Sequence, residues 1–351
     1  MTAVRAFVLQ LARSLGAFAV AKFITRKQLR ILCYHGFSLG DEYQVAPGMF
    51  MRAATFDRRM AILRKRRIRV LPLDEAVRKF EAGQIRNGET VLTFDDGWAS
   101  NLTIGLPILE KYNYPACVYV TTEHLAASTE VFNVVLSYLV RRSGRSSVTL
   151  VGVHPIMDGR YEILGKTDET IVALIIAAEK AFPIAERQTA LRPIALALGM
   201  DLDHVLANGR FRLLEAAEIK ELSNCGVDIQ LHTHTHRLPD DRDSTAWEIE
   251  QNRGAVMRIT GVMPRHFCYP SGEYTERHPQ WLRQLGVVSG TTCDPGLNAP
   301  GGSVMLLKRF LDSDDFNDIA FEAEVCGLRE LARRARHWIR TPFVRRAGRV
   351  S

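Results

Sequence analysis

The sequence predicts an α/β fold in which parallel strands form a barrel with helices outside it. Short apolar runs alternate with helical patterns along most of the 351 residues, and this alternation is typical of parallel sheets covered by helices. The polar residues that could carry chemistry follow the carboxyl ends of the apolar runs. Barrels of this kind have their active sites at that end of the strands, so the two observations support each other.

Seven apolar runs are predicted to be strands, because each is short and is bounded by polar or turn-forming residues. They cover residues 31–34, 70–73, 91–94, 116–120, 227–231, 267–269 and 287–291. Apolar residues that recur with a helical period predict helices between these strands. The predicted helices cover residues 55–65, 73–82, 106–112, 214–224, 243–260 and 280–285.

Residues 124–212 interrupt this alternation. Their patterns predict helices over 131–142, 169–181 and 186–198, and a short hairpin within 147–163. We interpret this segment as a helical cap over the barrel mouth that shapes substrate selection. A purely structural insertion is an alternative that the sequence leaves open.

The strand at 91–94 ends in two adjacent carboxylates, Asp95 and Asp96, followed by Gly97. Side chains alternate in direction along a strand, so one aspartate can bind a metal while the other faces a reacting water. Gly97 has no Cβ and allows a sharp turn directly after the pair. Because an isolated Asp-Asp-Gly is more often a solvated turn, this motif needs a partner elsewhere in the chain.

Three histidines, His232, His234 and His236, follow the apolar run at 227–231. In an extended chain the outer two would lie about 13 Å apart, whereas two ligands of one zinc ion lie within about 4 Å. The chain must therefore curl after His232; a helical turn would serve, and residues 237–240 are a plausible place for it. With Asp96, the outer histidines would then form a metal site with open coordination positions.

The two motifs, Thr-Phe-Asp-Asp-Gly at 93–97 and His-Thr-His-Thr-His at 232–236, together resemble those of the polysaccharide deacetylases, the NodB-homology or carbohydrate esterase family 4 proteins. The resemblance extends over residues 31–312. It implies a distorted barrel of seven strands rather than eight, and metal-dependent removal of N-acetyl groups. It also implies roles for the site residues, with Asp95 as general base and Asp96, His232 and His236 as metal ligands.

The resemblance leaves His234 at a variable position, where it lines the groove or contacts solvent. The expected ion is Zn²⁺, with Co²⁺ or Ni²⁺ as alternatives because these metals accept similar ligands. Such an ion would activate a water molecule and polarise the acetyl carbonyl.

A third family motif corresponds to residues 266–272. In the family a backbone N–H of this motif holds the oxyanion, and we assign that role to Tyr269; an aromatic strand end without a catalytic role is an equal alternative. Many family members have an arginine here that orients the catalytic aspartate, but Cys268 occupies that region in this chain. Cys268 could also approach the metal.

The late leucine-x-histidine motif that supplies the family's general acid does not occur in the C-terminal part of the sequence. His35, which follows the strand at 31–34, resembles the acid of circularly permuted family members. An imidazole can donate a proton to an amine leaving group near neutral pH, so we assign the proton donor to His35. If His35 is only structural, the donor is unknown.

Positive charge is confined to the two ends of the chain. Residues 1–31 contain six basic and no acidic residues, and residues 328–351 contain eight arginines and one glutamate. The ends therefore carry +6 and +7, which leaves −6 for the central portion of a chain whose net charge is +7. Nucleic acid is not expected as a partner, because the barrel is acidic and the basic N-terminal segment is rich in apolar residues.

The apolar N-terminal run is interrupted by Arg13 and Lys22, so it lacks the roughly 20 uncharged apolar residues of a membrane span. A signal peptide is a weak alternative, because no convincing cleavage site precedes the barrel. We interpret residues 1–30 as a basic amphipathic segment that rests on an anionic membrane surface, helped by a basic helix or tail over 313–351. The alternative is a helix packed on the barrel, with a solvated tail.

The length and a hydrophobic content of 46% allow one large domain, residues 31–312, plus these appendages. Six cysteines occur without a Cys-x-x-Cys pair, and several lie inside apolar runs, which favours reduced, buried thiols. We therefore expect a cytoplasmic protein, peripheral on the inner face of the cell membrane.

The sequence as a whole predicts a metal-dependent N-deacetylase whose substrate is an N-acetylated carbohydrate: a chitooligosaccharide-like chain, a surface polysaccharide or a lipid-linked glycan. Hydrolysis of a small non-sugar amide or imide on the same fold is an alternative. A non-catalytic glycan-binding protein is another, because the third motif departs from the family pattern.

Overall fold

The computed structural model describes residues 3–126 and 130–336. Its centre is a closed barrel of parallel strands, in the spatial order β1-β11-β10-β9-β8-β5-β4. The prediction of a seven-stranded (β/α) barrel is thus confirmed. The strands are β1 (Arg30–Tyr34), β4 (Thr90–Phe94), β5 (Cys117–Val120), β8 (Asp228–Leu231), β9 (His266–Cys268), β10 (Ser289–Pro295) and β11 (Leu307–Leu311).

Burial on both faces explains why most of these strands are nearly continuous apolar runs. All five residues of β1 and all five of β4 are buried. The two strands pair in register from Arg30 opposite Thr90 to Tyr34 opposite Phe94. The residues that follow them, His35 and Asp95, are therefore brought to the same end of the barrel.

Two strand predictions differ from the structure. The run at 70–73 is not a barrel strand: Val70 forms a single bridge with Thr90, and Leu73 already begins a helix. The seventh strand is instead β11, which the apolar pattern missed. In β11 an exposed lysine and a buried arginine, Lys308 and Arg309, interrupt the apolar residues, so the strand lacks a continuous apolar run.

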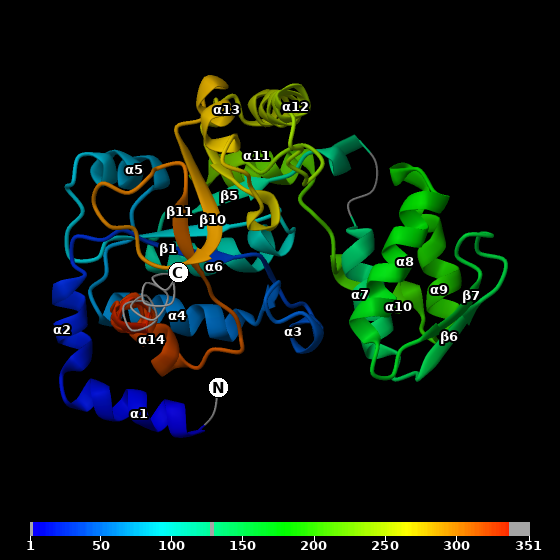
Figure 1. Ribbon diagram of the computed structural model, residues 1–351, viewed down its shortest axis with the longest axis horizontal. Helices are drawn as coiled ribbons and strands as arrows, with labels where there is room; N and C mark the ends of the chain where they lie inside the picture. Colours follow the sequence, from blue (N-terminus) through cyan, green and yellow to red (C-terminus); the bar gives the residue numbers. More distant parts are fainter. Residues whose placement is uncertain (1–2, 127–129, 337–351) are drawn as a thin grey trace, which may run out of the picture.

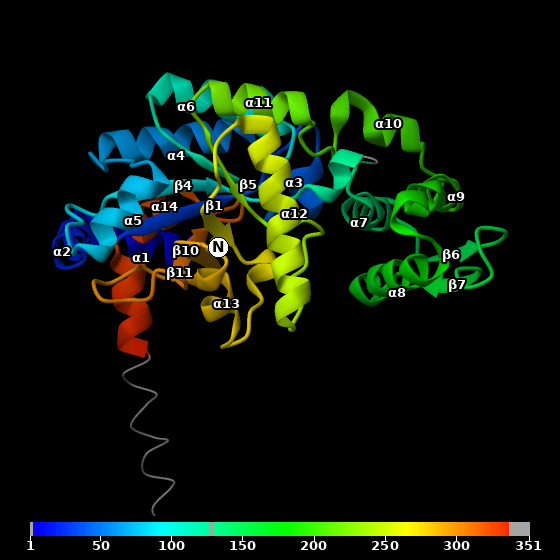
Figure 2. The same ribbon diagram turned by 90° about the horizontal axis from the view of Figure 1, so that it is seen from above.

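Helices cover the outside of the barrel (Figure 1, Figure 2). They are α4 (Ala53–Lys65), α5 (Leu73–Glu81), α6 (Leu106–Tyr112), α11 (Ala216–Asn224), α12 (Arg242–Thr260), α13 (His278–Gln284) and α14 (Asp318–Val325). A π-helical turn, η1 (Asn101–Gly105), precedes α6, and a 3-10 turn, η5 (Pro270–Gly272), follows β9. A small addition pairs β2 (Gly36–Phe37) with β3 (Phe50–Met51) and encloses α3 (Glu42–Val45).

The insertion forms a separate lobe beside the barrel, drawn in green in Figures 1 and 2. Its helices pack around their own cluster of buried apolar side chains, which include Leu136, Leu139, Leu174 and Ile194. The predicted helical pattern and hairpin are present, except that 186–198 is a 3-10 segment followed by a short α-helix. The elements are η2 (Glu123–Ala126), α7 (Phe132–Arg142), β6 (Ser147–Leu150), β7 (Gly159–Glu162), α8 (Thr167–Ala181), η3 (Ile184–Ala190), α9 (Leu191–Ala197), α10 (Leu202–Leu206) and η4 (Ala207–Gly209).

The N-terminal segment is two short helices, α1 (Ala3–Ser14) and α2 (Ala17–Ile24), rather than one. They meet at Gly16, whose φ of 81° is left-handed, and their axes differ by 77°. Phe18 is buried against Ile319, Ala323 and Cys326 of the α14 region. No single helix among the described residues is long and apolar enough to cross a membrane, although the bent pair passes that test by length and composition.

Candidate metal centre and catalytic site

The two carboxylates after β4 face different surroundings. Asp95 is 3% exposed and lies within the barrel mouth. Asp96 has a left-handed backbone conformation with φ of 71°, and Gly97 follows with φ of 82°. A left-handed aspartate is uncommon and costs free energy that the surrounding structure must offset. The turn separates the two side chains, as the alternation of a strand end predicts.

Asp96 lies directly beside both outer histidines of the second motif. Its Oδ1 is 3.3 Å from Nε2 of His232 and 3.4 Å from Nε2 of His236. Two tetrahedral ligands bound about 2.1 Å from one zinc ion lie about 3.4 Å apart. The three side chains therefore have the spacing of metal ligands, and His236, which is 43% exposed, leaves the position open toward solvent.

Among the described residues, two other groups of three potential ligands also lie close together: Cys33–His35–Asp95 and Asp95–His232–Cys268. Both depend on Asp95, whose two oxygens already bind the guanidinium of Arg309. That positive charge would repel a cation. Burial also raises the pKa of the Cys268 thiol well above its usual range, so it is a poor ligand. Asp96, His232 and His236 are thus the set that fits a metal.

The curl that brings His236 back to His232 is irregular, not helical, and it occurs within 233–236 rather than at 237–240. Thr233 and His236 both have left-handed φ values, 64° and 60°. One carboxylate of α12, Glu248, holds the turn by accepting hydrogen bonds from the backbone N–H groups of His234 and Thr235 at 2.8 and 2.9 Å. A buried carboxylate in place of helical hydrogen bonds explains the difference from the predicted helical turn.

Further contacts fix the orientation of the ligands. Nδ1 of His232 lies 2.9 Å from the carbonyl oxygen of Cys268, which leaves Nε2 facing Asp96. The indole N–H of Trp98 donates to Oδ2 of Asp96 at 3.0 Å. Such supporting hydrogen bonds position metal-binding side chains and tune their basicity. Burial opposes ionisation of Asp96, but its hydrogen bonds with the two histidines hold the pKa of Asp96 well below its usual range.

His234 faces the other way. Its Nδ1 lies 2.9 Å from Oγ1 of Thr122, and its ring packs edge-on against Trp247. His234 also lines the cavity described below, in agreement with its assignment to the groove.

Asp95 forms a buried ion pair with an arginine that the sequence motifs did not reveal. Nη1 and Nη2 of Arg309, on β11, donate to Oδ1 and Oδ2 of Asp95, both at 2.7 Å. Arg309 is fully buried, and its Nε donates to the carbonyl oxygen of Thr292. Burial alone would raise the pKa of Asp95, but the guanidinium holds that pKa far below its usual range. Asp95 is therefore ionised at neutral pH.

The bidentate pair also bears on the third motif, where this chain has Cys268 instead of an arginine. The resemblance implies an arginine that orients the catalytic aspartate, and the third motif has a cysteine in that region. In the barrel, β11 supplies the guanidinium from another strand, and Nη2 of Arg309 lies 3.3 Å from Sγ of Cys268. A buried arginine thus contacts Asp95, although it comes from β11 and not from the third motif.

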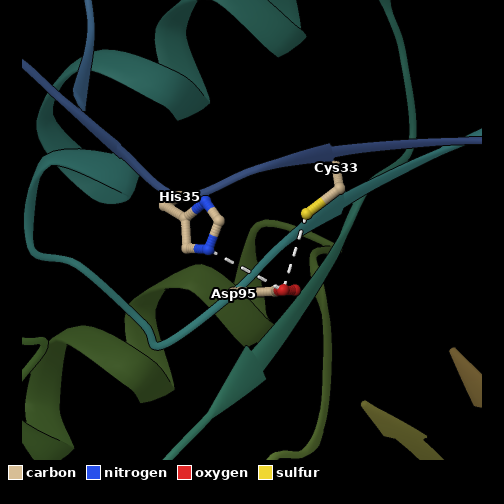
Figure 3. A group of neighbouring side chains, drawn as sticks. All are labelled: Cys33, His35 and Asp95. Atoms are coloured by element: carbon tan, nitrogen blue, oxygen red, sulfur yellow. Dashed lines mark hydrogen bonds and ion pairs between the residues drawn. The ribbon is translucent and has the colours of Figure 1, made fainter. Parts of the chain in front are cut away.

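His35 reaches the same carboxylate from β1 (Figure 3). Its Nε2 is 4.0 Å from Oδ2 of Asp95, and its side chain is 19% exposed. The thiol of Cys33 lies 3.5 Å from the same oxygen, and burial raises the pKa of this thiol well above its usual range. Asp95 thus has two neighbours from the β1 segment. His35 is partly exposed to solvent, and Cys33 is buried with a neutral thiol.

Tyr269 is buried, and its backbone N–H donates to the carbonyl oxygen of Thr291 at 3.1 Å. This hydrogen bond belongs to the pairing of β9 with β10, so the N–H points into the sheet. Ser271, two residues later, has a left-handed φ of 56° and lines the same cavity as Asp96 and His236. The structure therefore brings Ser271, rather than the Tyr269 N–H, to the site.

A cavity of about 450 Å³ lies between the barrel mouth and the insertion lobe. The barrel contributes Asp96, His236 and Ser271, and the lobe contributes Arg187 and Gln188. The sequence predicted that the insertion forms a cap over the barrel mouth. In the structure the lobe instead lies beside the mouth and forms one wall of this cavity. Small-molecule sites commonly have volumes of about 300–1,000 Å³, so the cavity is large enough for a substrate group.

Three residues of the site had escaped the sequence analysis. Arg309 lies in a strand without an apolar pattern, although a lone arginine beside Phe310 and Leu311 is a weak sign of a buried charge. Ser271 lies in the third motif, where the sequence predicts the oxyanion role for Tyr269 instead. Glu248, within a long helix, has no local signal at all, because its partners lie 13 and 14 residues earlier in the chain.

Comparisons with known proteins agree with this geometry. The sequence matches the family described as polysaccharide deacetylase over residues 83–154 and 186–290, half of the chain. None of the curated proteins matches it. The gap between the two matched segments falls inside the insertion lobe, and both metal-ligand motifs lie within the matched residues.

Several solved structures share the fold at low sequence identity. IcaB from Ammonifex degensii has 18% identity and a TM-score of 0.55, over 86% of this chain and 97% of that one. Streptococcus pyogenes deacetylase PplD, solved in complex with acetate, has 16% identity and a TM-score of 0.53, over 82% and 92%. The Bacillus anthracis protein BA0330 has 16% identity and a TM-score of 0.54, over 86% and 69%. At these identities the likeness concerns the fold alone.

Proposed function

Because this chain belongs to the polysaccharide deacetylase family, whose members hydrolyse the amide bond of N-acetylated glycans, we propose that it is a metal-dependent N-deacetylase of an amino-sugar substrate. The observation that carries the proposal is the arrangement at the barrel mouth. Asp96, His232 and His236 have the spacing of metal ligands, and Asp95 lies beside them in an ion pair with Arg309. The chain is thus a hydrolase of carbon–nitrogen bonds other than peptide bonds.

We assign the metal to Asp96, His232 and His236. A divalent ion there, Zn²⁺ or alternatively Co²⁺ or Ni²⁺, would supply a Lewis acid for the acetyl carbonyl and lower the pKa of a bound water. Trp98 and the carbonyl oxygen of Cys268 hold the ligands in place, so the site is organised before substrate arrives. Preorganised ligands cost no rearrangement during the reaction.

Asp95 is the proposed general base. Its carboxylate stays ionised because Arg309 lowers its pKa, so it can always accept a proton from the attacking water. The ion pair with Arg309 also makes the Asp95 carboxylate a weak base. The contribution of Asp95 to catalysis therefore depends on its position. The bidentate contact fixes both oxygens, and Oδ2 also faces His35. A fixed acceptor within reach of the water is the geometric requirement for this role.

His35 is the proposed proton donor to the amine that leaves. It follows β1, which pairs with both β4 and β11, and part of its ring reaches solvent. The proton that Asp95 takes from water and the proton that His35 gives to nitrogen then balance in one turnover.

For the oxyanion we propose the backbone N–H of Ser271, in place of that of Tyr269. Ser271 lines the cavity and has a left-handed backbone conformation, whereas the N–H of Tyr269 is engaged by Thr291. A backbone donor at this point would stabilise charge that develops only in the transition state.

The lining of the cavity is an argument for a carbohydrate substrate. Its wall mixes both signs of charge, with Glu123, Arg187 and Arg237 among the lining residues, and such groups can bind the hydroxyls of a sugar. Arg237, next to His236, pairs with Glu179 of the lobe at 2.8 Å. The lobe is therefore joined to the metal-binding turn, and we propose that it selects the glycan.

The test is acetate release by the purified protein after chelation and reloading with zinc, cobalt or nickel. Substrates would be N-acetylated chitooligosaccharides, an N-acetylglucosamine polymer and a lipid-linked N-acetyl sugar, with a small amide and a cyclic imide as comparisons. We expect metal-dependent acetate release from a glycan, with products identified by mass. Turnover of only the non-sugar amides would contradict the proposal, as would sugar binding without turnover in the metal-loaded protein.

Substitution of the base gives the sharpest check. Asp95→Asn should lower acetate release by about 100- to 10,000-fold, the usual contribution of a general base, while metal content stays near that of the wild type. Asp243→Asn, an exposed aspartate of α12, is the matched control and should leave both unchanged. His35→Ala should lower kcat by a similar factor; full retention of kcat would assign the proton donor elsewhere.

A further inference from the structure

The N-terminal helices expose an unusually dense apolar surface. Eight of the 21 large apolar side chains exposed among the described residues lie between positions 4 and 24. We call them the N-terminal apolar face. They are Val4, Phe7, Val8, Leu11 and Leu15 on and just after α1, and Val20, Phe23 and Ile24 on α2.

The exposed apolar residues of α1 form a continuous stripe along one side of the helix. Positions 4, 7, 8, 11 and 15 follow the i, i+3, i+4, i+7 spacing that places side chains on one side of a helix. The opposite side of α1 packs on the protein, through Ala6, Leu9 and Ala12 and through an ion pair between Arg13 and Glu322. The helix is thus apolar on the side that faces solvent as well as on the side that is covered.

Basic residues surround the face. Residues 1–31 contain no acidic residue. Lys22 of α2 donates a hydrogen bond to the carbonyl oxygen of Arg66, which places α2 beside the basic run at 64–67. In that run Arg64, Lys65 and Arg67 are exposed. Two segments distant in the sequence therefore combine into one positive rim beside the apolar surface.

We propose that the N-terminal apolar face is a docking surface for an anionic lipid membrane, on which α1 and α2 lie in the interfacial layer. Apolar side chains that enter the acyl boundary, with lysine and arginine at the headgroups, are the features of interfacial helices. A second copy of this chain would present the same positive rim and be repelled. The bend of 77° between the helices favours lying on the surface over crossing the bilayer.

The test is sedimentation of the full-length protein with vesicles of neutral phosphatidylcholine, and of phosphatidylcholine mixed with phosphatidylglycerol. We expect binding to the anionic vesicles, reduced by high salt. Because the readout is binding, the result does not depend on the deacetylase activity. Absence of binding to anionic vesicles would overturn the proposal.

Two variants separate the apolar and electrostatic contributions. Phe7→Ser with Leu11→Ser and Leu15→Ser should abolish sedimentation, and thermal unfolding should be unchanged because these side chains are exposed. The matched control replaces three exposed apolar residues of the lobe, Val151, Leu164 and Leu196, by serine. The control should bind like the wild type; equal binding by both variants would overturn the proposal.

Charge is tested in the same way. Replacement of Arg5, Lys27 and Lys65 by glutamine should weaken binding to anionic vesicles by on the order of 100-fold, since each basic residue near an anionic surface contributes severalfold. Replacement of Arg242, Arg258 and Arg283, which are exposed on the far helices α12 and α13, is the control of equal charge and should have little effect.

Two further outcomes would overturn the assignment in defined ways. A dimer in light scattering that the Phe7, Leu11 and Leu15 substitutions dissolve would identify a second copy as the occupant. Resistance of the bound protein to alkaline carbonate extraction would show that the helix pair spans the bilayer, because interfacial helices are released by that treatment.

Discussion

The barrel and the insertion lobe use charge in opposite ways. Inside the barrel, Arg309 and Asp95 pair with side-chain exposures of 0% and 4%. In the lobe, Arg192 and Asp203 pair with exposures of 65% and 72%. A buried pair must be matched atom by atom, because an unpaired charge there is strongly destabilising. An exposed pair is screened by water and salt and contributes little.

This difference indicates how each region is used. The barrel fixes a few charged atoms within hydrogen-bond distance of one another, as catalysis requires. The lobe has its own apolar core and presents polar side chains, such as Arg187, to the cavity. We expect changes in the barrel to affect stability and kcat together, and changes in the lobe to affect substrate binding alone.

The largest effect is expected from the buried pair. Arg309→Met leaves the Asp95 charge buried without its partner and should lower the free energy of unfolding by about 3–5 kcal/mol. Urea unfolding measures this loss, and kcat should fall with it because Asp95 loses its orientation. Arg192→Met, which removes the exposed partner of Asp203, should leave the unfolding curve nearly unchanged. Equal effects of the two substitutions would contradict the comparison.

A second buried group of the barrel makes stability depend on pH. His266, on β9, is 1% exposed, and burial lowers its pKa to about 4 from 6.5, although Asp74 lies nearby and opposes this. The unfolded state therefore binds more protons between these two values. Stability should be complete above about pH 6.5 and should fall as the pH drops toward 4, by roughly 3 kcal/mol.

The measurement is the free energy of unfolding across this pH range, for the wild type and His266→Gln. The variant should be less stable at neutral pH, since Ser289 loses its contact with Nδ1, but its stability should depend less on pH. The same slope in both proteins would show that another group is responsible.

The smallest effect is expected in the lobe. Arg187 lines the cavity, its Nη1 is 3.7 Å from Glu179, and its buried Nε has no hydrogen-bond partner among the described residues. Arg187→Ala should raise KM by about tenfold, the loss of one hydrogen bond of about 1.4 kcal/mol, and leave kcat unchanged. Arg192→Ala is the matched control on the next helix. A fall in kcat with constant KM would mean that the lobe acts on the chemistry itself.

The strand-end motifs could be found from the sequence because each is local. An apolar run that ends in Asp95 and Asp96, and another that ends in His232, have the signature of buried strands with polar residues at their carboxyl ends. Their meeting at one end of the barrel follows from parallel pairing. Six of the seven barrel strands were predicted on this basis, and the strand that was missed carries the buried arginine.

The remaining features are set by contacts between distant residues. The curl at 233–236 depends on Glu248 of α12, and the choice between Tyr269 and Ser271 depends on which N–H pairs with β10. Neither contact leaves a pattern in the nearby sequence. The roles of Asp95, Asp96, His35, His232 and His236 are assignments that the proposed assays test. The cytoplasmic location stays a prediction.

The sequence by itself determined the family, the alternating fold and the residue types of the site, because periodic burial and strand-end polarity are properties of neighbouring residues. Only the tertiary structure decided that Arg309 pairs with Asp95, that the insertion forms a side wall, and that α1 keeps an apolar face toward solvent. The pairing of Arg309 and the docking of α1 bring together residues that are hundreds of positions apart in the sequence.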